Sequence, residues 1–123
     1  MMDDQLKQLF DYTKFHIGMY TTLVAGIIGV FATESLKRDA FGKMIPFLEG
    51  SIVLFLIAGM FGGLVASSIP FFTSFEHFSK ARLCPWSTDS DRGLPSILCT
   101  HIEHFAFWLG CVLAVVGLFV ALS

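Results

Sequence analysis

The sequence has little charge, and its basic residues form no cluster. Its 123 residues include 8 Lys and Arg and 10 Asp and Glu, for a net charge of −2, and the basic residues occur singly or in pairs. Nucleic acids and anionic surfaces attract dense basic patches. We therefore expect no direct nucleic-acid binding.

Cysteine is also scarce, with three residues in the chain. Three cysteines are too few for a disulfide scaffold, and Cys111 lies in an apolar run where it behaves as a small hydrophobic residue. Cys84 and Cys99 share one polar segment. A bridge between them requires that this segment face an oxidising compartment.

Sequence motifs of catalysis are missing. The chain contains no Gly-rich phosphate loop, no His-Glu-x-x-His zinc motif and no Gly-x-Ser-x-Gly nucleophile motif. The central parts of its apolar runs contain no Asp, Glu, Lys, Arg or His, whereas proton relays and ion-coupled transporters need such a residue. We expect neither an enzyme nor a pump.

What the sequence does contain is long apolar runs. Residues 50–72 form a run of twenty-three residues without a charged side chain. A helix needs about 20 apolar residues to cross the hydrocarbon core of a bilayer. With a mean hydropathy of +0.71 and 54% hydrophobic residues, the chain is predicted to be an integral membrane protein.

We predict a single all-α membrane domain, residues 1–123, with three transmembrane helices. The spans cover residues 15–33, 47–70 and 101–122. Apolar residues at every third or fourth position before the first span predict an amphipathic lead-in that continues into it. A cleaved signal peptide is the alternative for this first run, but its leader is acidic where a basic one is expected.

The polar segment 73–99 joins the second and third spans. Its first part places phenylalanines on one side and charges on the other, which is typical of a short helix lying in the headgroup region. Two prolines, a glycine and a Ser/Asp cluster predict an irregular loop in the second part. The capping boxes Thr73-x-x-Glu76 and Thr100-x-x-Glu103 predict helix starts at Thr73 and Thr100.

Small residues recur at three- and four-residue intervals in all three predicted spans. This spacing lets helix backbones approach closely in lipid, and we expect the row on the first span to meet the row on the second. One further face is left for another chain, either a second copy or another membrane subunit. The predicted helix-packing residues are Gly26, Gly29, Ala58, Gly59, Gly62, Gly63, Ala66, Ser67, Gly110, Ala114 and Gly117.

Four histidines fall on the side of the N-terminus and of the segment 73–99. His101 and His104 are three residues apart on one helix, and imidazole with carboxylate suits zinc or iron. The candidate ligands are His77, His101, His104 and Glu103, and a haem held by two helices is another possibility. The simpler interpretation is that the chain binds no cofactor and that Glu103 only caps a helix.

Glu49 begins the second span and is a candidate pore acid. In a ring of subunits its carboxylates would form a collar that favours cations. Alternatively, Glu49 only complements the helix dipole. Lysine and arginine number five on the side of the N-terminus and three on the other, which predicts an inner or cytoplasmic membrane with the N-terminus inside.

Three functions are compatible with these features. The first is a pore- or channel-like, or holin- or effector-like, component that acts by oligomerising in the lipid bilayer. The second is a non-catalytic accessory subunit of a larger membrane complex, and the third is a membrane enzyme with a histidine-ligated metal or haem. We favour the first, because the spans lack charge and carry small-residue rows.

Overall fold

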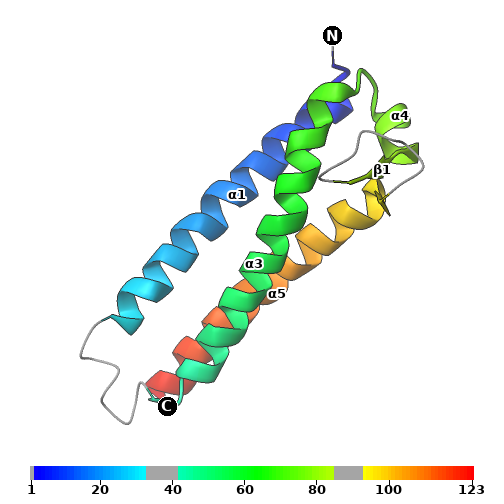
Figure 1. Ribbon diagram of the computed structural model, residues 1–123. Coiled ribbons are helices and arrows are strands. Elements are labelled where there is room, and N and C mark those ends of the chain that lie inside the picture. Colours follow the sequence, from blue (N-terminus) through cyan, green and yellow to red (C-terminus); the bar gives the residue numbers. More distant parts are fainter. Residues whose placement is uncertain (1, 33–41, 85–92) are drawn as a thin grey trace.

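The computed structural model describes residues 2–32, 42–84 and 93–123. Three long helices make up most of it, and they run in alternating directions, so that the two termini lie at opposite ends (Figure 1). The prediction of a mostly helical fold is confirmed. The helices are α1 (Asp4–Phe31), α3 (Ile45–Ser68) and α5 (Ser96–Leu122).

Helix α1 begins directly after Asp3, whose side chain caps it. Asp3 Oδ1 accepts a hydrogen bond from the backbone N–H of Leu6 at 2.8 Å, which satisfies one of the free donors at the helix start. From there the helix continues without interruption to Phe31. The predicted lead-in therefore does run directly into the first apolar stretch, although Thr33 lies outside the described residues.

Helices α3 and α5 pack closely against each other through small residues of α5. A Cβ atom added to Gly110 would lie 2.8 Å from Cε1 of Phe55, and one added to Gly117 would lie 2.8 Å from Cβ of Phe47. The hydroxyl of Ser51 donates to the carbonyl oxygen of Gly110 at 2.8 Å. Glycine at these positions lets the two backbones approach, as the small-residue spacing predicts.

Two segments of the described chain are long and apolar enough to cross a membrane. They are Ile45–Phe71 and Ser96–Leu122, and only 28% and 22% of their most apolar windows are buried. The core helix of a soluble protein would be mostly buried, so these exposed apolar surfaces support a location in a membrane. Helix α1 is not among these segments.

The segment between α3 and α5 is more ordered than predicted. A 3₁₀ turn, η2 (Ile69–Phe71), follows α3, and a short helix, α4 (Phe75–Lys80), comes next. The strands β1 (Arg82–Leu83) and β2 (Leu94–Pro95) then pair antiparallel. They replace the two ends of the predicted irregular loop, and residues 85–92 lie outside the described part.

Neither predicted capping box is present. The cap of α4 is Ser74, whose hydroxyl accepts from the N–H of His77 at 3.3 Å. Helix α5 begins at Ser96 instead of Thr100, because tertiary contacts serve as its cap. Ser96 donates its backbone N–H to the carbonyl of Ala81 at 3.0 Å and its hydroxyl to the carbonyl of Phe78.

Buried side chains form two cores along the bundle. The N-terminal core joins the start of α1 to the end of α3, to α4 and to the start of α5. Asp3 ties these parts together, since its Oδ2 accepts from the N–H of Phe75 at 2.6 Å. Phe78 is fully buried here, so α4 packs on the bundle end. The N-terminal core contains Leu6, Val65, Ile69, Phe78, Leu83 and Cys99, and the central core contains Tyr20, Ile27, Met44, Leu48, Phe55, Ala58, Ala106 and Phe107.

Candidate functional site

Three polar side chains are buried on the inner face of α1. Thr13, His16 and Tyr20 are 1%, 1% and 6% exposed, and their spacing of three and four residues places them on one face of the helix. Burying a polar group costs free energy unless it finds a partner. This layer of the bundle is therefore where a function beyond packing is to be sought.

Helix α5 places a carboxylate and a second imidazole opposite this face. Oε1 of Glu103 lies 2.9 Å from Nδ1 of His16, and Oε2 lies 2.7 Å from Nδ1 of His104. Glu103 is as buried as His16, whereas His104 is partly exposed. The possible metal-ligating atoms of the three residues all lie within 4.8 Å of one another. We refer to His16, Glu103 and His104 as the His-Glu-His cluster.

Aromatic rings hold the cluster in place. The His16 ring is stacked on Phe107 with 4.2 Å between the ring centroids, and the Tyr12 ring also lies at 4.2 Å. The Trp108 ring is nearly perpendicular to the His16 ring, with 6.4 Å between the ring centroids. These contacts restrict the rotation of the imidazole and keep water away, which strengthens its charge-assisted hydrogen bond with Glu103.

Helix α3 approaches the cluster at a glycine. A Cβ atom on Gly62 would lie 2.9 Å from the hydroxyl of Tyr20 and 3.1 Å from Cγ of Glu103. Only a residue without a side chain leaves room for both groups. Gly62 thus permits α1, α3 and α5 to meet at one level of the bundle.

Three buried polar atoms in this region have no hydrogen-bond partner among the described residues: Oγ1 of Thr13, the hydroxyl of Tyr20 and Oε2 of Glu103. The last is close to His104, but the Nδ1 of that ring is aligned instead with the carbonyl of Thr100 at 2.9 Å. Buried polar atoms in proteins are nearly always satisfied. The region therefore has unused capacity to bind a polar group or an ion.

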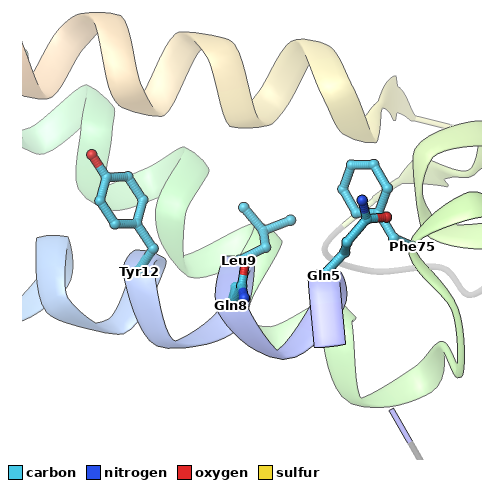
Figure 2. Close-up of a pocket in the computed structure, with 5 residues that line it drawn as sticks. All are labelled: Gln5, Gln8, Leu9, Tyr12 and Phe75. Atoms are coloured by element: carbon cyan, nitrogen blue, oxygen red, sulfur yellow. The ribbon is translucent and has the colours of Figure 1, made fainter. Parts of the chain in front are cut away.

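A shallow groove of about 400 Å³ is formed by residues of α1 and by Phe75 of α4 (Figure 2). Tyr12 extends from α1 in the direction of α5 at one end of the groove. Its ring is partly exposed and lies 5.0 Å from the His104 ring. Tyr12 therefore separates the groove from the cluster. The groove is lined by Gln5, Gln8, Leu9, Tyr12 and Phe75.

The structure brings together only two of the four predicted metal ligands. Glu103 and His104 belong to the cluster, whereas His77 and His101 are exposed and are not part of it. The interpretation of Glu103 as a helix cap is wrong, because α5 begins seven residues before it. The third member, His16, was not among the predicted ligands. Its position between Thr13 and Tyr20 at helical spacing was the one signal that it faces inward.

The predicted helix-packing residues divide into a buried, a half-buried and an exposed set. Contrary to expectation, the row on α1 does not meet α3: no described atom of a neighbouring group lies within 4 Å of a Cβ at Gly26 or Gly29. Helix α1 meets α3 instead where the Tyr20 ring lies against Gly59. The buried set is Ala58, Gly62, Gly110 and Gly117, the half-buried set is Gly59, Ala66 and Ala114, and the exposed set is Gly26, Gly29, Gly63 and Ser67.

The other candidate residues lie apart from the cluster. Glu49 is exposed and is the fifth residue of α3, just beyond the first turn in which it was predicted. Cys84 and Cys99 are free thiols, as is Cys111. The structure therefore contains no Cys84–Cys99 bridge.

No family model, curated protein or solved structure matches this chain. Its function must therefore be inferred from its own residues. The His-Glu-His cluster offers two nitrogen donors and one carboxylate in a buried layer. Such a set can lock α1 to α5 through the hydrogen bond between His16 and Glu103, and it has the composition of a metal site.

Proposed function

We propose that this chain is a small three-span membrane protein that assembles through α1 into an oligomer, and that the oligomer forms or gates a permeation path. Support for the membrane location comes from α3 and α5, which expose large apolar side chains along their length. Leu56, Met60, Phe119 and Leu122 are all more than half exposed. In water these surfaces would favour aggregation, whereas lipid accommodates them.

Helix α1 is proposed to be the third span. Residues 15–31 rise about 25 Å at 1.5 Å per residue, close to the roughly 30 Å of a bilayer core. The stretch contains no Asp, Glu, Lys or Arg, and its one histidine, His16, is paired inside the bundle. Lys14 is exposed at its start and can extend its ammonium group to the headgroups.

The observation that carries the proposal is the uncovered small-residue face of α1. Gly18, Thr22 and Gly26 follow one another at four-residue spacing and are exposed. A groove of about 460 Å³ runs along this face. Because close helix contacts in lipid depend on such rows, the face fits the helix of a second copy. The groove is lined by Lys14, Phe15, Gly18, Met19, Thr22 and Leu23.

Beside this row, where neighbouring copies of α1 would diverge, the helix suits the lining of a path. The hydroxyls of Thr21 and Thr22 donate to the carbonyls of Ile17 and Gly18, at 2.7 and 2.9 Å, so neither donor is left unsatisfied in lipid. A ring closed around α1 would present these hydroxyls between apolar residues. A narrow lining of this kind gates by dewetting.

The test is to measure assembly and leakage together in the full chain. Native mass spectrometry in mild detergent should show a homo-oligomer, and liposomes that contain the protein should leak ions. Gly26→Leu should reduce both by blocking close approach, while the control Val115→Leu, on the exposed side of α5, should change neither. A monomer without leakage contradicts the proposal, and a monomer that co-purifies with another membrane protein indicates the accessory-subunit function instead.

Reporters fused to the two termini test the three-span arrangement. Three crossings place the termini on opposite sides of the membrane, with the N-terminus inside by the distribution of lysine and arginine. Reporters found on the same side would exclude α1 as a span.

A further inference from the structure

We propose that the His-Glu-His cluster binds a divalent transition-metal ion of the zinc or ferrous-iron class. Two imidazoles with one carboxylate form the ligand set of catalytic zinc sites and of non-haem iron sites. Calcium and magnesium prefer oxygen ligands, and this cluster offers oxygen from Glu103 alone. The site does not depend on the proposed pore function.

The spacing of the cluster is close to that of a metal site. Ligand atoms 2.0 to 2.1 Å from a tetrahedral ion lie about 3.3 Å from one another. In the structure the two nitrogen-to-oxygen distances are 2.9 and 2.7 Å, and all of the ligand atoms fall within 4.8 Å. Small rotations of Glu103 and His104 would therefore allow the ligand atoms to bind one ion. The protons that these atoms share would be released to solvent, because the ligands bind metal in their deprotonated forms.

An ion pair alone does not account for the whole arrangement. Pairing His16 with Glu103 at 2.9 Å uses one carboxylate oxygen. The second oxygen, Oε2 of Glu103, is buried but has no aligned hydrogen-bond donor. The hydroxyl of Tyr20 is also buried and has no hydrogen-bond partner among the described residues. A cation at the cluster would satisfy Oε2 directly. A metal-bound water in an open coordination position would give the Tyr20 hydroxyl a partner.

The surroundings support the same assignment. The His16 ring is stacked on Phe107 and lies beside the tilted ring of Tyr12. These contacts fix its orientation, as groups outside the ligand shell do for metal ligands. The groove ends at Tyr12, whose ring lies next to both histidines, and His104 is itself partly exposed. An ion can therefore reach the cluster from the side of His104.

Metal titration of the purified full-length protein tests the proposal. The protein is stripped with a chelator in detergent, and Co²⁺ is added while visible absorption is recorded. Zn²⁺ then displaces the cobalt, and bound metal is counted by mass spectrometry. We expect one ion per chain. His104→Ala and Glu103→Gln should each weaken binding at least about tenfold.

The matched control is His101→Ala, which removes an exposed histidine one turn away on the same helix and should bind as wild type does. Circular dichroism shows whether each variant keeps its helices, and His104→Ala carries the test if Glu103→Gln unfolds, because His104 is partly exposed. Absence of stoichiometric metal in the wild type overturns the proposal. Equal metal binding by wild type and His104→Ala also overturns it. The same holds if His101→Ala loses as much metal binding as His104→Ala does. The pore-blocking variant Gly26→Leu should keep its metal, so that the two proposals fail separately.

Discussion

The two halves of helix α1 are held in different ways. Residues 4–20 present Leu6, Thr13, His16 and Tyr20 to the rest of the bundle, and all four are buried. In residues 21–31, Ile27 is the one buried side chain among those described. Figure 1 shows the C-terminal end of α1 standing away from α3 and α5.

The difference follows from the side chains in each half. Long side chains reach across to neighbours, and the His16–Glu103 contact bridges residues 87 positions apart. In the second half Gly26 and Gly29 are exposed, and no described atom of a neighbouring group lies within 4 Å of a Cβ at either position. A single helix can thus be anchored by specific contacts at one end and offer an open surface at the other. Four substitutions test this contrast.

The largest effect is expected for Glu103→Ala. This change leaves His16 buried without its partner, and breaking one side of a buried pair costs about 3–5 kcal/mol. Unfolding in detergent, followed by circular dichroism, measures the loss. Glu76→Ala is the control, because its partner Lys80 is well exposed and such pairs contribute little. Equal stability of the two variants would show that the cluster does not anchor α1.

Gly62→Ala should come next, with a loss of about 1–3 kcal/mol in the free energy of unfolding. The added methyl group would lie 2.9 Å from the Tyr20 hydroxyl and 3.1 Å from Cγ of Glu103, so the side chain of Tyr20 or that of Glu103 must shift. The same unfolding experiment measures this change. A neutral result would mean that the contact between α3 and the cluster is looser than the structure shows.

Asp3→Ala should cost about 1 kcal/mol, because it removes the cap of α1 and the acceptor of the Phe75 N–H. Hydrogen exchange should become faster at the amides of Leu6 and Phe75. Asp4→Ala is the matched control, since Asp4 is the exposed neighbour and should leave these amides protected. If both variants exchange alike, Asp3 does not join α1 to α4.

The smallest effect, and of opposite sign, is expected in the second half of α1. Gly26→Ala should raise the free energy of unfolding by up to about 1 kcal/mol, because alanine favours helix over glycine. The described structure offers no clash, since no neighbouring atom lies within 4 Å of the added carbon. Destabilisation of the isolated monomer by this methyl group would show that the second half of α1 is packed after all.

Local patterns in the sequence were enough to predict the helices. The run from Ile45 to Phe71 and the short helix at Phe75–Lys80 follow from apolar length and from spacing on one face. These features depend on neighbours in the chain, and for that reason the sequence alone reveals them.

The candidate site could be predicted only in part. Glu103 and His104 were predicted as candidate ligands, and the structure brings them together with His16, but Glu103 also matched a capping pattern that the folded chain does not use. Helix α5 begins earlier because Ser96 bonds to Ala81 and Phe78. This moves Glu103 from a helix start into the bundle, where it meets His16. No local pattern contains that information.

The sequence by itself therefore determined the number of long helices and the apolar character of α3 and α5, because both depend on composition and on short-range spacing. Tertiary structure decided which small residues are covered. It buried Gly62 and Gly110 and left Gly26 and Gly29 open. It also decided which histidine faces the carboxylate of Glu103, since contacts between helices depend on how whole helices are rotated and aligned, and that is settled by packing across the bundle.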